Sequence, residues 1–288
     1  MKCAFIDRHR GQWRLTSMCR VLDVSRARYY QWRQRPVSGR AASDARLVPQ
    51  IRITFAELHR RCGSPRVHRE LRAQGTCVSR KRVERLMRQE GLRAKRPRAF
   101  TVTTQSAHAH PVAPNRLQRQ FQVPHVNRVW GADITYLPPA EGWLYFAVVL
   151  DLCSRRVVGW ACSARLSQPL TLHALEMAVT ARRPRRGLRH HSDRGSQYAS
   201  AAYRPRLTQA GLECSMSRAG DCWDNAMVES FFATLKIELD LDRIWPTRAA
   251  ARSEVVAFVE GWYNRRRRHS ALDDLTPIEF EAQQAQAA

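Results

Sequence analysis

Three acidic residues have types and positions that could bind metal ions. Asp133 lies inside the apolar run "VWGADITYL", Asp193 follows a short strand-like run in "HHSDRGSQY", and Glu229 lies in a helix-forming segment. Each alone is explained as simply by a cap, a turn or a salt bridge, but a buried strand acid is costly unless paired or bound to a cation. Together they offer the carboxylates that Mg²⁺ prefers. Two such ions could carry out phosphodiester chemistry.

The helix that contains Glu229 gives this acid a defined direction. Its apolar face consists of residues spaced by three, four and seven, namely Val228, Phe231, Phe232, Leu235 and Leu239. Glu229 is one position off this stripe, so it can flank the buried face and point towards a sheet. Lys236 lies two turns further along the same side. It is one of only four lysines among 49 basic residues, so a lysine at this place is noticeable.

The elements that must position these acids form an α/β pattern. Three β-rich runs joined by short turns, at 128–138, 143–152 and 155–163, predict an antiparallel meander. A helix at 169–182, a strand at 187–192, a helix near 199–210, a strand at 212–217 and a long helix from about 224 follow. We therefore expect a mixed five-stranded sheet with flanking helices. Asp151, at the end of the second run, is interpreted as a turn residue, and Asn225 as a helix cap.

The basic charge of the chain is concentrated near its N-terminus. The formal net charge is +24, and residues 1–100 hold 26 Lys and Arg against 7 Asp and Glu. Such a block favours binding to a polyanion, foremost nucleic acid. The longest apolar run, at 143–150, is too short to span a membrane. The eight cysteines form no CxxC pair, which indicates reduced thiols in the cytosol and no zinc site.

The N-terminal third is expected to be helical. Residues 12–35 have helix-turn-helix spacing, with Ser17 and Ser25 as caps and Met18, Val21 and Leu22 on one inward face. A second module carries Leu47, Ile51, Phe55 and Leu58 on one face. Its last helix follows Ser79 and ends at Gly91. That helix presents basic side chains that are candidates for DNA contact: Arg80, Lys81, Arg82 and Arg85.

These patterns divide the chain into five parts. We expect a helix-turn-helix-like segment at 1–40, a basic helical DNA-binding module at 41–95, a basic linker at 96–124, a catalytic core at 125–240 and a C-terminal helical extension at 241–288. The extension contains the run Arg265, Arg266, Arg267 and Arg268 after an aromatic stretch, for which we favour phosphate contact over simple solvation. Gln197 and Tyr198 could position DNA or merely pack a loop.

The motifs together resemble a known family. "WGADITYL", "HHSDRGSQY", "SMSRAGDCWDNAMVESFFATLKIE" and "YNRRRRHSALDDLTPIEF" are similar to successive motifs of the downstream-frame catalytic subunit of two-frame bacterial insertion-sequence transposases, in the retroviral-integrase superfamily. Thirty-five residues separate Asp193 from Glu229, and Lys236 follows by seven, as in the family's DD(35)E signature. The likeness extends over nearly the whole chain. One departure is Cys62, where the family usually has tyrosine.

The resemblance implies an RNase H-like core that cleaves and transfers DNA strands. Asp133, Asp193 and Glu229 would be the catalytic metal ligands, with Mg²⁺ or Mn²⁺, two ions per site. Lys236 would contact DNA near the reacting phosphate. Water would attack a phosphodiester at the element's end, and the freed 3′-hydroxyl would attack a second one. Expected partners are the double-stranded DNA of element ends and target, and an upstream-frame protein or a fusion with it. We expect a multimer on DNA, in the bacterial cytoplasm with the nucleoid.

Two other interpretations stay open from the sequence. A nuclease on the same core would hydrolyse nucleic acid without joining ends. A DNA-binding regulator, or a transposase remnant that binds without cutting, would keep the basic surface.

Overall fold

The computed structural model describes residues 1–34, 38–94, 112–218, 222–240 and 243–287. Within them the chain forms two compact units, which divide between Arg93 and Ala94. Residues 95–111 lie outside the described residues, and they include 96–111 of the predicted linker. Residues 112–124 belong to the second unit, where Ala113 and Leu117 are buried.

The first three helices form a small cluster. They are α1 (Lys2–Arg8), α2 (Leu15–Val21) and α3 (Arg26–Gln34), and they enclose Ile6, Met18, Cys19, Val24 and Tyr29. The two helices expected within 12–35 are confirmed, and the Ser25 hydroxyl caps α3 by accepting from the Arg28 backbone N–H. Ser17 caps nothing, because α2 begins two residues before it. Val21, expected to point inward, is 78% exposed.

The next three helices bury the predicted apolar faces. They are α4 (Gly39–Glu57), α5 (Ser64–Ala73) and α6 (Arg80–Gln89). Leu47, Ile51, Phe55 and Leu58 are all buried. The Ser79 hydroxyl accepts a hydrogen bond from the Arg82 backbone N–H, so α6 has its predicted cap. Cys62 is buried directly before α5, where it fills a packing position.

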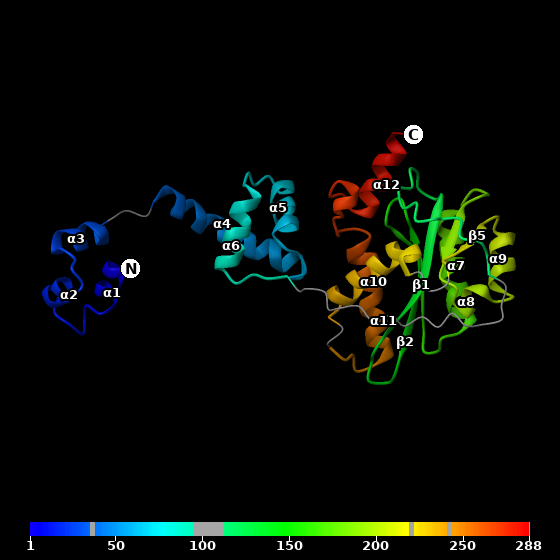
Figure 1. Cartoon of the computed structure of the whole chain (residues 1–288), viewed down its shortest axis with the longest axis horizontal. Coiled ribbons are helices and arrows are strands. Elements are labelled where there is room, and N and C mark those ends of the chain that lie inside the picture. Colours follow the sequence, from blue (N-terminus) through cyan, green and yellow to red (C-terminus); the bar gives the residue numbers. More distant parts are fainter. Residues whose placement is uncertain (35–37, 95–111, 219–221, 241–242, 288) are drawn as a thin grey trace. The chain divides into compact units, whose positions relative to one another are not determined.

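A mixed five-stranded sheet forms the centre of the second unit (Figure 1). Its strands are β1 (Val129–Leu137), β2 (Leu144–Asp151), β3 (Val157–Ser163), β4 (Arg189–Ser192) and β5 (Glu213–Met216). The spatial order is β3-β2-β1-β4-β5. β1, β2 and β3 pair antiparallel, whereas β4 is parallel to both β1 and β5. The predicted meander and mixed sheet are confirmed.

Helices cover both faces of this sheet. On one face lie α7 (Gln168–Arg182), α8 (Ser196–Ala199) and α9 (Tyr203–Gln209), and on the other lie α10 (Ala226–Glu238) and α11 (Arg248–Val256) (Figure 1). α7 packs closely on β3 because a Cβ at Gly159 would lie 2.2 Å from the Ala174 carbonyl oxygen. Met177 of α7 is 39% exposed. The short 3₁₀ turn η1 (Cys222–Asn225) leads into α10.

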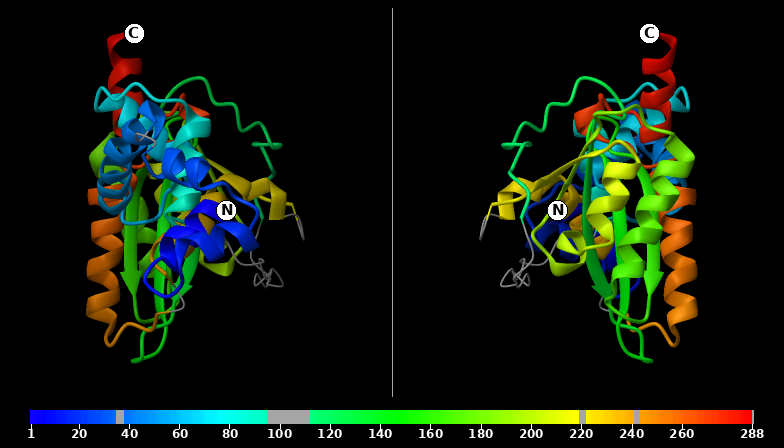
Figure 2. Two further views of the ribbon diagram at one scale, coloured as in Figure 1. Left: turned by 90° about the vertical axis from the view of Figure 1, so that its left-hand side faces the viewer. Right: turned by 90° about the vertical axis from the view of Figure 1, so that its right-hand side faces the viewer.

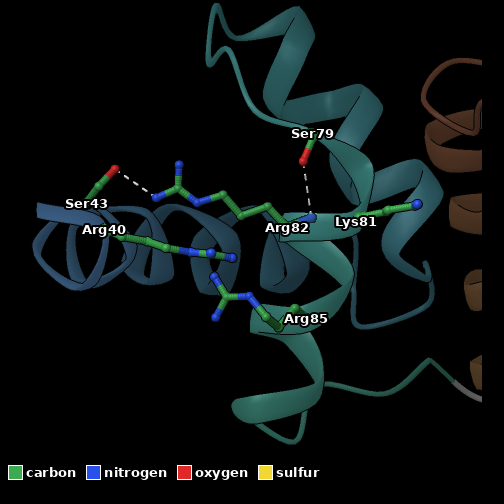
Figure 3. Close-up of a pocket in the computed structure, with 6 residues that line it drawn as sticks. All are labelled: Arg40, Ser43, Ser79, Lys81, Arg82 and Arg85. Carbon is green, nitrogen blue, oxygen red and sulfur yellow. Dashed lines mark hydrogen bonds between the residues drawn. The ribbon is translucent and has the colours of Figure 1, made fainter. Parts of the chain in front are cut away.

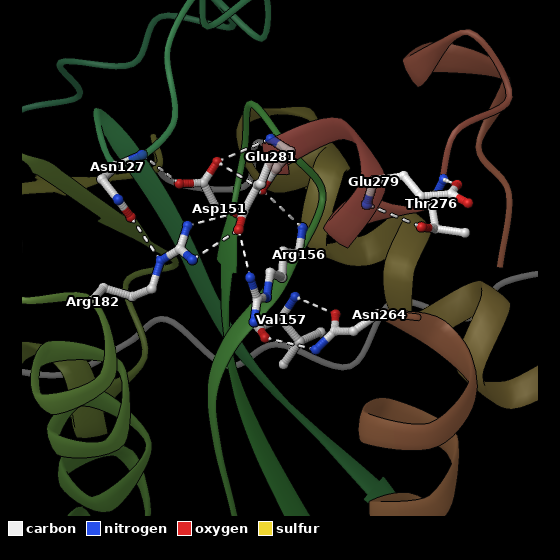
Figure 4. A network of polar contacts seen from close by, with 10 residues as sticks. Asn127, Asp151, Arg156, Val157, Arg182, Asn264, Thr276, Glu279 and Glu281 are labelled. Carbon is white, nitrogen blue, oxygen red and sulfur yellow. Dashed lines mark hydrogen bonds and ion pairs between the residues drawn. The ribbon is translucent and has the colours of Figure 1, made fainter. Parts of the chain in front are cut away.

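The C-terminal extension is helical, as expected, and returns to the sheet. α11 continues into a π-helical segment, η2 (Ala257–Tyr263), followed by the 3₁₀ turn η3 (Ser270–Leu272) and α12 (Pro277–Gln286). Glu281 of α12 accepts hydrogen bonds from Arg156, Arg182 and Ser154 at the end of the sheet (Figure 4). Views from two further sides show this helix leaving the core at one end (Figure 2).

Asp151 is the turn residue that its position predicted. It is fully buried, and its carboxylate accepts backbone N–H groups of Asn127, Cys153 and Ser154. Burial raises the pKa of Asp151, and these N–H donors oppose the rise. None of the helices described is long and apolar enough to cross a membrane.

Candidate active site

The strand register makes Asp133 and Asp193 neighbours. β1 and β4 run parallel, and their last paired residues are Ala132 and Ser192. Asp133 and Asp193 each come one residue later, at equivalent positions on adjacent strands. Both side chains are half-buried. Two carboxylates therefore lie side by side where β4 ends beside the middle of β1. The carboxyl end of a parallel strand is a common place for ligands in α/β sheets.

Helix α10 brings Glu229 to the same face of β1. A Cβ at Gly131 would lie 2.7 Å from a methyl group of Val228, so the helix rests directly on this part of the strand. Alternate residues of a strand share a face, so Asp133 faces the same way as Gly131, towards α10. Glu229 follows Val228 in the first turn of the helix.

The amide of Asn225 fixes the start of α10. Its Nδ2 donates a hydrogen bond of 3.3 Å to the carbonyl oxygen of Ala132, the residue before Asp133. Asn225 occupies the N-cap position, but its side chain makes no cap hydrogen bond. The prediction that it caps the helix is wrong in this respect, because the amide bonds to the strand instead.

The acids repel one another. Burial raises the pKa of Asp133 well above its usual value, and the charges of Asp193 and Glu229 raise it further. The Ile134 backbone N–H and the Lys236 ammonium act in the opposite direction. Burial also raises the pKa of Glu229. Clustered negative charge of this kind attracts a cation.

The three acids are of the residue types that bind divalent cations, but their side chains are not arranged around a common metal position. Among the residues that the structure describes, no group of three or more His, Cys, Asp or Glu side chains is arranged to hold a metal ion. The hard oxygen donors and the adjacent strand ends fit Mg²⁺ or Mn²⁺.

Lys236 faces the acids. Its side chain is half-buried, its Nζ lies 5.7 Å from the centroid of the Tyr136 ring, and its charge interacts with that of Asp133. Burial lowers the pKa of Lys236, and Asp133 raises it. Lys236 is therefore partly buried beside Tyr136 and interacts with Asp133.

Gln197 and Tyr198, which follow the loop after Asp193, differ in their exposure. The Gly195 backbone N–H donates to the Asp193 carboxylate at 2.9 Å and so shapes the turn. Gln197 is half-buried beside this turn. Tyr198 is only 2% exposed and packs against Tyr203 in the core, with ring centroids 5.2 Å apart. The prediction of DNA contact by Tyr198 is therefore wrong, because α8 turns its side chain inward.

The arginine run of the C-terminal extension is not one uniform surface. Arg265 and Arg266 are exposed. Arg267 is buried, and its Nε donates to Glu238 of α10 at 3.0 Å. Arg268 donates to the Asp274 carbonyl oxygen at 3.1 Å. The phosphate role predicted for Arg267 is wrong, because this guanidinium joins the extension to α10.

Basic side chains also gather in the first unit. A hollow of about 540 Å³ lies between α4 and α6 and is lined by Arg40, Ser43, Ser79, Lys81, Arg82 and Arg85. Figure 3 shows the guanidinium groups of Arg40, Arg82 and Arg85 turned towards one another, with Lys81 directed elsewhere. Asp44 binds Arg82 at 2.7 Å and Arg85 at 2.6 Å. Arg80 and Lys81 are exposed.

One residue near the acids was missed by the sequence analysis. The Asp224 side chain is fully buried directly before Asn225, where it accepts from Arg218, Arg119 and Asn115. Burial alone would raise the pKa of Asp224, but the hydrogen bonds and charge of Arg218 and the hydrogen bond from Arg119 outweigh it and lower the pKa to about 2. Its position beside a helix-forming segment resembles an ordinary cap, and its partners come from distant parts of the chain.

Known protein families and individual proteins are similar to this chain. Residues 123–222 and 210–277 match models described as integrase core domain, and residues 42–100 match an HTH-like domain. Transposase InsF for insertion sequence IS3A of Escherichia coli K12 is 42% identical over 98% of both chains. The insertion element IS600 uncharacterized 31 kDa protein of Shigella sonnei is 43% identical over 94% of this chain and all of that protein. The HTLV-2 integrase catalytic core domain in complex with magnesium (trimeric form) is 17% identical, with a TM-score of 0.39 over 54% of this chain and 96% of that one.

Proposed function

Because the chain belongs to the IS3-type insertion-sequence transposases with an integrase core, and so is a DNA transposase, we propose that Asp133, Asp193 and Glu229 carry its phosphoryl transfer. The observation that supports this assignment most directly is the parallel register of β1 and β4, which makes the two aspartates neighbours on the face covered by α10. A regulator or an inactive remnant is not favoured by these relatives.

We infer that the three carboxylates hold divalent cations, Mg²⁺ or Mn²⁺, two per site. Such ions, when bound, help to activate an attacking oxygen and to stabilise a leaving oxygen at phosphorus. Asp133 and Asp193 offer oxygen ligands from the sheet, and Glu229 adds a third from the helix. Burial and, after it, repulsion by Asp193 and Glu229 raise the pKa of Asp133, and a bound cation would relieve the repulsion.

Two displacements at phosphorus make up the reaction. In the first, water attacks a phosphodiester at the end of the element, and the bond to the 3′-oxygen breaks to leave a free 3′-hydroxyl. In the second, that hydroxyl attacks another phosphodiester, forming one P–O bond as one breaks. No covalent bond to the protein forms. Lys236, turned towards Asp133, is placed to contact the negatively charged phosphate.

We assign DNA contacts to the remaining accessible basic and polar residues. Arg265 and Arg266 are exposed on the C-terminal extension, and Gln197 borders the Asp193 loop. In the first unit Arg80 and Lys81 are exposed, while Arg82 and Arg85 line the basic hollow but share Asp44. Contacts of this type fix the DNA without reading its sequence.

We further propose partners for this activity. Two active sites must act on two DNA ends, so a multimer assembles on DNA, and an upstream-frame protein or a fusion with it supplies much of the end recognition. The bacterial relatives support action on the DNA of the nucleoid, in the cytoplasm.

The test compares the purified wild type with Asp133→Asn, Asp193→Asn and Glu229→Gln on labelled element-end DNA, with Mg²⁺ or Mn²⁺ and with the upstream-frame protein. We expect metal-dependent nicks and joined products from the wild type, and a loss of at least about a thousandfold in each variant, with DNA binding retained. Arg252→Gln, at an exposed position of α11 with no assigned DNA contact, serves as a surface control that keeps the chemistry. Products made equally well by the three acid variants would refute the assignment, and cleavage without joined products would point to a nuclease.

A further inference from the structure

The hairpin between β1 and β2 carries two large aromatic side chains that the core does not bury. Tyr136, near the end of β1, is 37% exposed, and Trp143, directly before β2, is 49% exposed. The two rings pack edge to face, with an angle of 76° between their planes and 4.8 Å between their centroids. Exposed rings of this kind offer a flat apolar surface on which another flat group can stack.

The turn that carries Trp143 is held firmly. The Arg248 guanidinium, at the start of α11, donates to the carbonyl oxygens of Trp143 and Glu141, and the Arg248 backbone N–H donates to the Glu141 carboxylate. The Ala140 backbone N–H donates to the Trp245 carbonyl oxygen at 2.8 Å. The two exposed rings therefore stand on a fixed backbone, which lowers the entropy cost of binding to them.

The aromatic pair lies close to the proposed chemistry. The Lys236 Nζ is 5.7 Å from the Tyr136 ring centroid, and the same ammonium interacts with Asp133. Tyr136 lies three positions after Asp133 on β1, about 10 Å at ~3.3 Å per residue. Stacked nucleotides advance ~3.4 Å along one strand. The rings are therefore within about three nucleotides of a phosphate bound at the acids.

The sheet leaves this part of β1 without a partner strand on one side. β4 pairs with β1 only from Val129 to Ala132, so β1 from Asp133 to Tyr136 continues beyond the end of β4. A DNA strand with one phosphate between the acids and Lys236 can follow this edge towards the rings. Lys236 supplies the positive charge that the phosphates require next to an apolar platform.

We propose that Tyr136 and Trp143 form a stacking platform for an unpaired base of the DNA strand that is cut. This inference rests on the proposed function and adds a feature of its substrate: the base pairs next to the cleaved phosphodiester open, and the platform takes an exposed base. Stacking on aromatic rings tolerates any base, so the platform stabilises the opened end without selecting its sequence.

The first experiment uses element ends that are fully paired or mismatched over the last three base pairs. Trp143→Ala slows cleavage of the paired end about tenfold, because the opened state loses its stacking partner. It slows cleavage of the mismatched end less than about twofold, because that end is already open. Trp143→Phe keeps a ring and keeps most of the rate. Met177→Ala, which alters an exposed apolar residue of α7, cuts both ends as the wild type does.

The second experiment measures stacking without chemistry. In a Glu229→Gln background, 2-aminopurine placed at each of the last three positions reports the environment of the base. We expect its fluorescence to be quenched at one position with Trp143 present and to rise severalfold with Trp143→Ala, at equal DNA occupancy. Thermal unfolding of each variant shows whether it is folded.

The outcomes separate the two proposals. If the wild type binds element ends but cuts neither one, the proposed function fails, and the fluorescence alone decides the platform. If Trp143→Ala slows both ends equally, or if the fluorescence is the same with and without Trp143, the platform is refuted whatever the cleavage. Rings that bind a partner protein instead would give this second result.

Discussion

The side-chain amide of Asn225 donates a hydrogen bond of 3.3 Å to the carbonyl oxygen of Ala132. This one contact joins the residue before Asp133 to the start of the helix that carries Glu229. Two acids from parts of the chain about a hundred residues apart thereby share one rigid support.

Replacing this amide should impair catalysis more than binding. In Asn225→Ala the buried Ala132 carbonyl oxygen loses its partner, which costs about 1–3 kcal/mol of stability. We expect strand cleavage to fall about 10- to 100-fold at unchanged DNA affinity, since a small misplacement of a catalytic group has effects of that size. Urea unfolding and single-turnover cleavage measure the two effects. An unchanged cleavage rate in a folded variant would show that the contact does not position Glu229.

Asp224 should hold the segment before β1 in place. Its carboxylate accepts from Asn115, whose own Oδ1 accepts the backbone N–H groups of Leu117 and Gln118. In Asp224→Asn we expect amide hydrogen exchange over residues 113–121 to become at least about tenfold faster. Glu213→Gln is the matched control, because it removes only an exposed pair with Arg116 on the same segment. Equal exchange in both variants would contradict this role.

Breaking the buried ion pair between α10 and the C-terminal extension should strongly destabilise the fold. Glu238 accepts from Arg267 at 3.0 Å and from the Trp262 indole N–H at 2.6 Å. Arg267→Leu leaves a buried carboxylate without its charge partner and should cost about 3–5 kcal/mol. Arg266→Leu, one residue earlier and exposed, should change stability by less than about 0.5 kcal/mol. Urea midpoints test the contrast, which fails if the two variants unfold together.

Two buried histidines should make stability depend on pH. Burial lowers the pKa of His190 to about 3 and that of His191 to about 4. Below the unfolded value of about 6.5 the unfolded chain binds more protons than the folded one, so stability falls as pH falls. Each histidine contributes up to about 1.4 kcal/mol per pH unit.

The variant His190→Gln isolates this contribution. Between pH 6 and 4 its unfolding free energy should fall less steeply with acid than that of the wild type, by up to about 1.4 kcal/mol per pH unit. The carboxyl groups titrate in both proteins and cancel in the difference. His173→Gln changes an exposed histidine and serves as the control. Parallel pH curves for His190→Gln and the wild type would show that His190 is not held neutral.

Asp44 should restrain DNA binding by the first unit, because it neutralises Arg82 and Arg85. Arg80→Gln and Lys81→Gln should each reduce the slope of log affinity against log salt by about one. Asp44→Asn should instead steepen the slope and raise affinity for any duplex. Fluorescence anisotropy across a salt series measures this. A slope unaffected by Asp44→Asn would mean that both arginines already contact phosphate in the complex.

Local sequence patterns predicted the helices and strands because apolar spacing and capping act between residues close in the sequence. Alternating and continuous apolar runs identified β1 to β3, and the spacing around Val228 and Leu235 identified α10. The acids could be named because an acid within an apolar strand needs a partner. The helix boundaries at Ser25 and Ser79 followed from capping chemistry.

The errors arose where distant residues decide the outcome. Arg267 reads as part of a basic run, yet its partner Glu238 lies 29 positions away. Tyr198 follows a polar loop, but the packing of α8 and α9 buries its ring. No local pattern indicates that Asn225 turns its amide to Ala132 rather than to its own helix. Side-chain pairings across the fold were therefore the part that the sequence could not supply.

The contact of Glu281 with the end of the sheet can form only after the rest of the core has been synthesised. Its hydrogen bond to Ser154 spans 127 positions, which a ribosome covers in about 6–25 s at ~5–20 residues per second. During that interval Arg156 and Arg182 have emerged without their acidic partner, and Asp151 without the helix beside it. The core of a newly made transposase is therefore completed late in synthesis, so each molecule has a period between its first folded strands and its finished form.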